Sequence, residues 1–192
     1  MNTYEIQQGT ENEELIRQIN FVVEQVNTLK QKELYELYPY FFFSVFIKFQ
    51  NFIYNMFEKY SLGQNSTKGY KPSLKHNFQD EKELHSFLGT KKKDYIEYDE
   101  KIDLLSSYIF DPDIFFQLSM LQPIPYSQLI AIRNYIAHES NHSKNKLEQL
   151  KIIDSTTTLS DYFIKKKKGT SKSHFELIIE NLKDFSDYAI NG

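Results

Sequence analysis

The sequence predicts an all-α fold, a helical bundle with a polar insertion after its second helix. Apolar residues recur every three or four positions near both ends of the chain, the spacing of one face of an α-helix. The alternation of apolar and polar residues that marks a half-buried strand is weak throughout. The 192 residues are enough for one hydrophobic core, so we expect a single domain over residues 1–192.

The first predicted helix is amphipathic. Thr10 and Glu13 have the spacing of a capping box, which places the start of the helix at this point. We expect the helix to end near Leu37, because Pro39 follows. Its apolar stripe consists of Leu15, Ile19, Val22, Val26 and Leu29.

The second predicted helix, over about residues 40–60, is rich in Phe and Tyr. Polar residues such as Lys48 and Gln50 interrupt its apolar run, which indicates a buried helix and not a membrane span. The cluster Phe41–Phe43 is expected in the core or in a dimer interface.

A polar insertion is predicted over residues 61–94, because this stretch is rich in Gly, Ser and Lys. It contains one short expected helix over residues 80–88, which Gly89 ends. Helical character returns over residues 95–109.

A further helix is expected to begin at Asp111-Pro112, with the aspartate as its N-cap, and to continue to about Leu121. Proline residues at 123 and 125 separate it from the next helix. That helix is predicted over residues 126–141.

The last part of the chain combines a basic segment with a terminal helix. Residues 155–172 form the predicted basic connecting segment, with a short extended piece over 162–164. Ser173 and Glu176 repeat the capping-box spacing and open the last helix. Its expected apolar stripe is Phe175, Ile178, Ile179, Leu182 and Phe185.

Composition narrows the class of protein. The chain has no cysteine, which excludes disulfides and thiolate metal sites and fits a cytoplasmic protein. The formal charge of −3 gives no general attraction to nucleic acid, although lysine runs create local positive charge. The only two arginines are Arg17 and Arg133, so a guanidinium at position 133 suggests a use for planar, bidentate geometry.

The stretch RNYIAHESNH, from Arg133 to His142, contains two motifs that share His138. From His138 onward it is H-E-x-x-H, the two ligands and the general base of many zinc hydrolases. A catalytic zinc also needs a third protein ligand, and Glu148 stands where the extended motif has histidine. Glu176 is a distant alternative ligand, but it fits better as a capping-box partner, so a zinc hydrolase is the remote alternative.

Read from Arg133, the same stretch combines a cation, an amide and an imidazole beside an apolar stripe that contains Leu129 and Ile132. Asn134 and His138 are one helical turn apart and are expected to touch. These groups suit RNA cleavage without a metal cofactor, in which a ribose 2′-hydroxyl attacks the adjacent phosphate. The histidine transfers the proton, and the guanidinium balances the charge that grows on the phosphoryl oxygens.

The run Arg133-Asn134-Tyr135-Ile136-Ala137-His138 resembles the R-N-x-x-x-H signature of the HEPN superfamily, the higher eukaryote and prokaryote nucleotide-binding domains. The match is strongest over about residues 128–146, and the predicted order of helices around the insertion is also similar. The resemblance implies a HEPN-like helical bundle that forms a homodimer, with two copies of the motif facing each other in one RNA-cleaving site. It assigns Arg133 and His138 as the catalytic pair and Asn134 as their support.

Many members of this superfamily are ribonuclease toxins or components of antiviral defence, often with an antitoxin or a larger complex as partner. Other members bind nucleotides or act as scaffolds without cleaving RNA, and this alternative stays open. The candidate RNA contacts outside the catalytic pair are His142, Lys144, Lys165, Lys166, Lys167 and Lys168. Tyr162 and Phe163, beside the lysine run, are candidates for stacking on bases.

Overall fold

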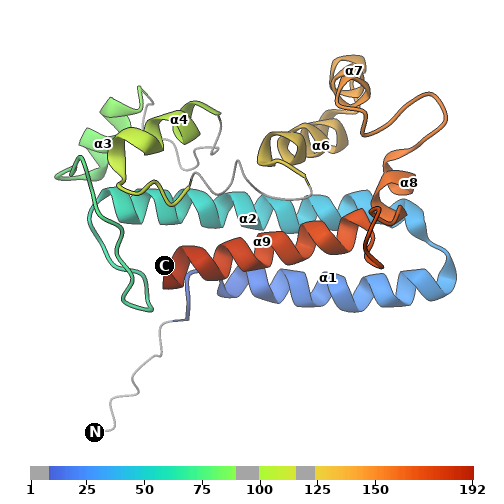
Figure 1. The fold of residues 1–192 in the computed structure, drawn as a ribbon, viewed down its shortest axis with the longest axis horizontal. Helices are drawn as coiled ribbons and strands as arrows, with labels where there is room; N and C mark the ends of the chain where they lie inside the picture. Colours follow the sequence, from blue (N-terminus) through green and yellow to red (C-terminus); the bar gives the residue numbers. More distant parts are fainter. Residues whose placement is uncertain (1–8, 90–99, 116–123) are drawn as a thin grey trace, which may run out of the picture.

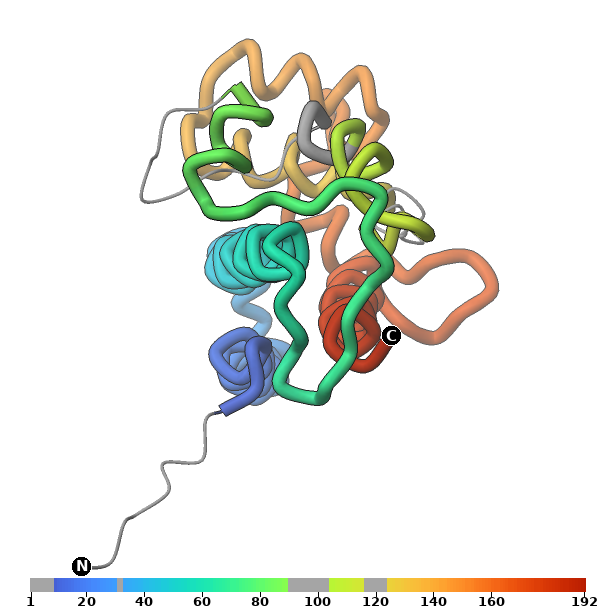
Figure 2. The backbone as a smooth tube through the Cα atoms, turned by 90° about the vertical axis from the view of Figure 1, so that its left-hand side faces the viewer, coloured from blue at the N-terminus to red at the C-terminus, as the bar shows by residue number. Residues whose placement is uncertain are grey.

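The computed structural model describes residues 9–89, 100–115 and 124–192, with the backbone alone described at residues 31–32 and 100–103. Three long helices run side by side along the molecule: α1 (Glu13–Lys32), α2 (Tyr38–Ser61) and α9 (His174–Asn191) (Figure 1). Viewed from one end, the shorter helices cover α2 and α9 on the side away from α1 (Figure 2). The described residues contain no strand, and the predicted all-α class is confirmed.

Six shorter elements complete the described part of the chain. They are η1 (Tyr35–Leu37), α3 (Glu81–Phe87), α4 (Glu100–Ile109), α6 (Tyr126–His138), α7 (Asn141–Gln149) and α8 (Leu159–Ile164). Helices α3 and α4 lie above one end of α2, and α6 and α7 lie above its other end (Figure 1). None of the described helices is long and apolar enough to cross a membrane.

The boundary between the first two helices differs from the prediction. Glu33 adopts a left-handed conformation, with φ of 57°, and this ends α1 five residues before α2 begins. The predicted capping box at Thr10 does not form, and Asn12 is the N-cap. The amide of Asn12 donates to Ser186 Oγ at 3.2 Å and to Asp187 Oδ1 at 2.9 Å, so it ties the start of α1 to α9.

The core is built mainly from the aromatic side chains of α2. The predicted apolar stripes of the first and last helices are buried as expected. Phe42 is fully buried, whereas its neighbours Phe41 and Phe43 are half-buried. The largest fully buried side chains are Tyr38, Tyr60, Phe42, Phe46, Phe49, Phe57, Phe110, Phe115, Phe163, Phe175 and Leu15.

The described part of the predicted insertion, residues 61–89, is closely tied to the bundle. Glu11 accepts hydrogen bonds from Thr67 N at 2.8 Å and from Thr67 Oγ1 at 2.6 Å. Ser66 Oγ donates to the carbonyl oxygen of Ile190 at 2.7 Å. The short helix α3 begins after its N-cap Asp80, as predicted, and buries Leu84.

Two predicted elements near the middle and end of the chain need correction. Asp111 is not a helix N-cap: residues 111–115 form bends and a turn, in which Asp113 Oδ1 accepts from Phe115 N at 2.9 Å. The helix expected to continue to residue 121 falls outside the described residues. The segment 162–164, expected to be extended, belongs to helix α8, because Thr158 and Asp161 form a capping box that starts a helix there.

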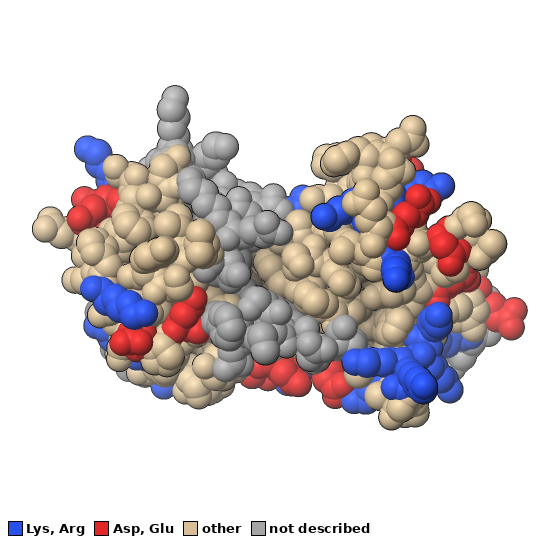
Figure 3. All heavy atoms as spheres, turned by 45° about the horizontal axis from the view of Figure 1, so that its top comes forward, with Lys and Arg blue, Asp and Glu red and all other residues tan. Residues whose placement is uncertain are grey.

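Surface charge is unevenly distributed over the described residues. On the face shown in Figure 3, the largest gathering of Lys and Arg lies at the end of the molecule where Figure 1 places α8. The exposed Lys165, Lys166 and Lys168 follow α8 directly. Residues other than Lys, Arg, Asp and Glu cover most of the rest of the described face, and smaller groups of Lys or Arg lie at its opposite end.

Candidate functional site

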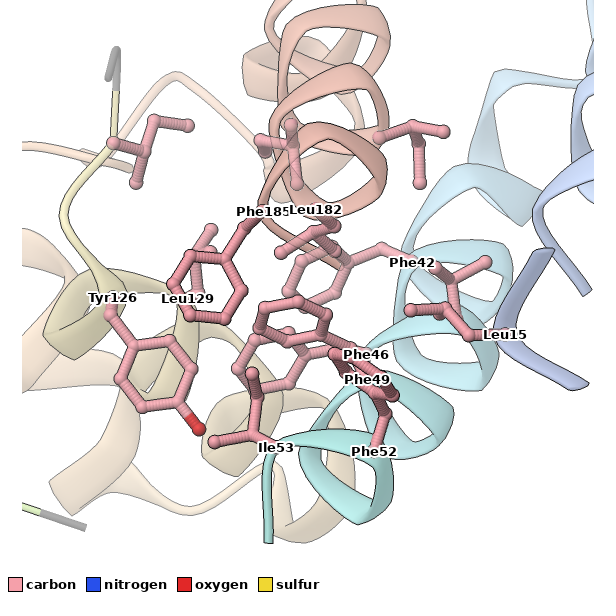
Figure 4. Packing of buried hydrophobic residues seen from close by; sticks show 14 of the residues in the cluster. Leu15, Phe42, Phe46, Phe49, Phe52, Ile53, Tyr126, Leu129, Leu182 and Phe185 are labelled. Carbon is pink, nitrogen blue, oxygen red and sulfur yellow. The ribbon is translucent and has the colours of Figure 1, made fainter. Parts of the chain in front are cut away.

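Helix α6, which carries the motif, is fixed to the bundle by its first two turns. Tyr126, Leu129 and Ile132 are buried. The Tyr126 ring packs against Phe46 and Phe49 of α2, with ring centroids 5.7 and 6.3 Å apart (Figure 4). This packing leaves the second half of α6 closer to the surface, where Ile136 is half-buried and Ala137 is exposed.

Arg133 is held between α6 and α2. Its Nε donates to Oε1 of Gln50 at 3.2 Å, and its Nη1 donates to Oδ1 of Asn134 at 2.8 Å. Gln50 is completely buried in the aromatic helix α2. Two fixed acceptors therefore orient the half-buried guanidinium.

His138 is the last residue of α6 and is exposed. Glu139 follows in a left-handed conformation, with φ of 43°, and its N–H donates to the carbonyl oxygen of Tyr135 at 2.8 Å. The sequence predicts a contact between His138 and Asn134, but the Asn134 side chain contacts Arg133 instead. Among the described residues, no hydrogen bond joins His138 to Arg133 or to Asn134.

The helix boundary also bears on the zinc alternative. The predicted helix over residues 126–141 is two helices, because Ser140 accepts a hydrogen bond from Ser143 N and begins α7. His142 lies in the first turn of α7, so His138 and His142 do not share the face of one helix. Glu176 forms the expected capping box with Ser173. In the described part of the chain, no three His, Asp or Glu residues are grouped to hold a metal ion.

The candidate RNA contacts are exposed except for Lys167, which is half-buried, and they belong to two separate elements. His142 and Lys144 lie on α7, where Lys144 is 3.9 Å from Glu148 in an ion pair. Lys165–Lys168 lie in the loop between α8 and α9. The loop is closed by hydrogen bonds from His174 N to the oxygen of Lys165 at 3.0 Å and from Lys167 N to the oxygen of Lys172 at 3.1 Å.

The two aromatic candidates beside this loop have different surroundings. Phe163 is completely buried, and its ring lies 5.2 Å from that of Phe42 and 5.7 Å from that of Phe175. It is a core residue, so the prediction that it stacks on bases is wrong. Tyr162 is half-buried and packs on His174, with ring centroids 4.5 Å apart.

Sequence reasoning missed two buried polar groups. Gln50 appears in the sequence only as an interruption of an apolar run, yet it holds Arg133. His85 is 4% exposed and lies 3.5 Å from Glu58 and from the hydroxyl of Tyr54 on α2, which helps to fix α3 on the bundle. The sequence does not single out Gln50, because Lys48, Asn51 and Asn55 also interrupt the apolar run of this helix.

Comparisons of this chain with models of protein families, with curated proteins and with solved structures give no match. Function is therefore inferred from the contacts of Arg133, the exposure of His138 and the motif in which both residues occur.

Proposed function

We propose that this protein is a metal-independent endoribonuclease of the HEPN type, with an active site completed by a second copy of the chain. The observation that supports this most directly is the arrangement of α6. Gln50 and Asn134 hold the Arg133 guanidinium, and an exposed histidine ends the same helix five residues later.

The proposed reaction requires a proton-transferring group and a fixed positive charge. His138 removes the proton of a ribose 2′-hydroxyl or delivers one to the leaving 5′-oxygen, because imidazole changes its charge near neutral pH. Arg133 stabilises the charge that develops on the phosphoryl oxygens. Asn134 positions the guanidinium through the hydrogen bond that it accepts from Nη1.

The separation of the Arg133 guanidinium and the His138 imidazole within one chain is the reason for proposing a dimer. Residues five positions apart on a helix point about 140° apart, and the Arg133 side chain reaches Gln50 on α2. The exposed end of α6, which includes Ala137 and His138, is accessible to a second copy. In the proposed homodimer, the two α6 ends face each other and combine arginine and histidine groups from both chains.

In this proposal the protein acts in the cytoplasm as a toxin or an antiviral-defence component, with an antitoxin or defence complex as its protein partner. The exposed lysines that follow α8, together with His142 and Lys144, contact RNA phosphates outside the reacting bond. No cofactor takes part in the proposed chemistry.

The test is cleavage of a single-stranded RNA and of the DNA of the same sequence. The protein is expected to cut the RNA only, because the DNA lacks the attacking 2′-hydroxyl, and to leave 2′,3′-cyclic phosphate ends. Arg133→Ala and His138→Ala should each lower the rate by about a hundredfold or more. His76→Ala is the matched control, since His76 is also an exposed histidine but lies on the segment before α3.

A mixture of the two inactive variants tests the shared site. If both chains contribute to one site, Arg133→Ala mixed with His138→Ala should recover part of the activity, because some mixed dimers hold one intact pair. Cleavage of DNA, or normal cleavage by both variants alone, would contradict the proposal.

A second candidate function is a non-catalytic module that binds a nucleotide or a partner chain. It is favoured by the engagement of Arg133 with Gln50 and Asn134, which also suits a purely structural arginine. Wild-type protein that cuts no RNA but forms a stable complex with a partner chain would select this alternative.

A further inference from the structure

The segment between α8 and α9, residues 165–173, folds as a short hairpin. Lys166 and Ser173 pair as an antiparallel bridge, and Lys167 N donates to the carbonyl oxygen of Lys172 at 3.1 Å. Gly169 lies in the turn with φ of 87°, a conformation that glycine adopts readily. These contacts fix the backbone of the lysine hairpin without using the lysine side chains.

The lysine hairpin concentrates positive charge. Five of its nine residues are lysines, and no Asp or Glu occurs between Asp161 and Glu176. Lys172 is neutralised by Glu180, at 2.6 Å. The ammonium groups of Lys165–Lys168 form no ion pair with any described residue, and three of these four side chains are exposed. Several fixed charges of one sign on one hairpin attract a polyanion more strongly than a single anion.

The position of the lysine hairpin relative to Arg133 follows from the packing on α2. Phe163, two residues before the hairpin, has its ring centroid 5.2 Å from that of Phe42. Arg133 of α6 instead contacts Gln50. Phe42 and Gln50 are eight residues apart in α2, which corresponds to about 12 Å along the helix axis. Helices α6 and α8 therefore attach to the same end of α2, but one behind the other (Figure 1).

This separation is too large for a single nucleotide to span. Neighbouring phosphates of a stacked strand are about 3.4 Å apart along its axis, so about 12 Å corresponds to three or four nucleotides. An RNA that is cut beside Arg133 therefore reaches the lysine hairpin through phosphates several nucleotides from the cut bond.

We propose that the lysine hairpin anchors the RNA strand that flanks the cleaved bond, so that the protein cuts long RNA in preference to short oligonucleotides. The anchored group is the phosphate backbone, which carries one negative charge per nucleotide and no sequence information. The identity of the substrate rests on the proposed ribonuclease function. The inference adds that the substrate occupies two places, the motif on α6 and the hairpin after α8.

The first test is the binding of a single-stranded RNA of about 20 nucleotides whose 2′-hydroxyls are methylated, so that no 2′-hydroxyl attack can cut it. Fluorescence anisotropy gives its affinity for the full chain at several salt concentrations. The triple variant Lys165→Gln/Lys166→Gln/Lys168→Gln removes three exposed charges and keeps the backbone hydrogen bonds. Each lost phosphate contact lowers the slope of log affinity against log salt by about 0.7, so the slope should fall by about 2 and the affinity at least about tenfold.

The triple variant Lys68→Gln/Lys71→Gln/Lys82→Gln is the matched control. It removes the same charge from exposed lysines of residues 61–89, at the other end of α2 (Figure 1). Its affinity should change by less than about twofold, because salt screens charges that are remote from the bound strand. Equal loss of affinity in the two triple variants, or no loss in the hairpin variant, would overturn the proposal.

The second test is steady-state cleavage of the unmodified RNA and of a dinucleotide, which is too short to reach the lysine hairpin. In the hairpin variant, the KM for the long RNA should rise at least about tenfold with kcat unchanged. The rate of dinucleotide cleavage should equal that of wild type. Equal slowing of both substrates would overturn the proposal. If wild type cuts neither RNA, the proposed ribonuclease function fails, and the binding measurement alone decides whether the hairpin holds RNA.

Discussion

Tyr38 and Tyr60 allow the same substitution to be compared at two buried positions of one helix. Both side chains are fully buried in α2, at 1% and 0% exposure. The hydroxyl of Tyr60 donates to Ala189, whereas that of Tyr38 has no partner among the described residues. Each Tyr→Phe change deletes a single oxygen atom, so the difference between the two variants isolates the effect of the hydrogen bond.

The expected effects have opposite signs. Tyr60→Phe leaves the buried carbonyl oxygen of Ala189 without its donor and should lower the free energy of unfolding by about 1–3 kcal/mol. Tyr38→Phe removes an unsatisfied hydroxyl and should leave that free energy unchanged or raise it by up to about 1 kcal/mol. We expect the two variants to differ by roughly 2 kcal/mol.

The assay is urea unfolding followed by circular dichroism in phosphate-free buffer. The comparison requires that the free energy of unfolding depend on urea concentration with the same slope in wild type and in both variants. Tyr60→Phe should shift the midpoint to lower urea, and Tyr38→Phe should not. If Tyr38→Phe destabilises the protein as much as Tyr60→Phe, the hydroxyl of Tyr38 has an acceptor in the free protein. The assignment of this hydroxyl as buried and unpaired would then be wrong.

Three further predictions concern stability and the candidate site. Hydrogen bonds to Glu176 outweigh the opposing effect of burial and hold its pKa at about 2, below the ordinary 4.5. The lowered pKa means that this carboxylate stabilises the fold above about pH 4.5, and that the contribution is lost as the pH falls towards 2. Acid titration of Glu176→Gln should therefore show a smaller loss of stability over this range than wild type, and parallel curves would contradict the assignment. Gln50→Met removes the acceptor of Arg133 Nε. It should reduce the rate of RNA cleavage at least tenfold, which corresponds to the loss of about one charge-assisted hydrogen bond. A normal cleavage rate would show that Gln50 has no positioning role. Phe163→Ala should lower the free energy of unfolding by about 3–5 kcal/mol in urea titrations, and a loss below about 1 kcal/mol would contradict its place in the core.

The parts of the fold that could be predicted from sequence are those governed by local rules. The terminal helix begins at Ser173 because the capping box with Glu176 satisfies backbone groups within four residues. Asp80 and Gly89 delimit α3 for equally local reasons. The buried stripes follow from helical spacing, which is a property of the sequence itself.

The features that were not predictable depend on contacts between distant residues or on one unusual backbone angle. Asn12 replaces Thr10 as the cap of α1 because its amide bonds to α9, more than 170 residues away. The motif helix ends at His138 because Glu139 is left-handed, an uncommon conformation for glutamate.

The candidate site illustrates the same limit. The motif identified Arg133, Asn134 and His138, but it gave no information about the residue that holds the arginine. That residue, Gln50, is 83 positions away on α2. Its role depends on how α6 packs on α2, through Tyr126 and the aromatic side chains beneath it, and no local pattern encodes that packing.

The most direct test of the central claim is the rate of RNA cleavage in excess EDTA by wild-type protein and by His138→Ala. Metal-independent chemistry at the Arg133–His138 site predicts that wild type cuts RNA in EDTA and that His138→Ala is slower by about a hundredfold or more. Loss of wild-type activity in EDTA with recovery on adding zinc, or equal cleavage by the two proteins, would contradict it.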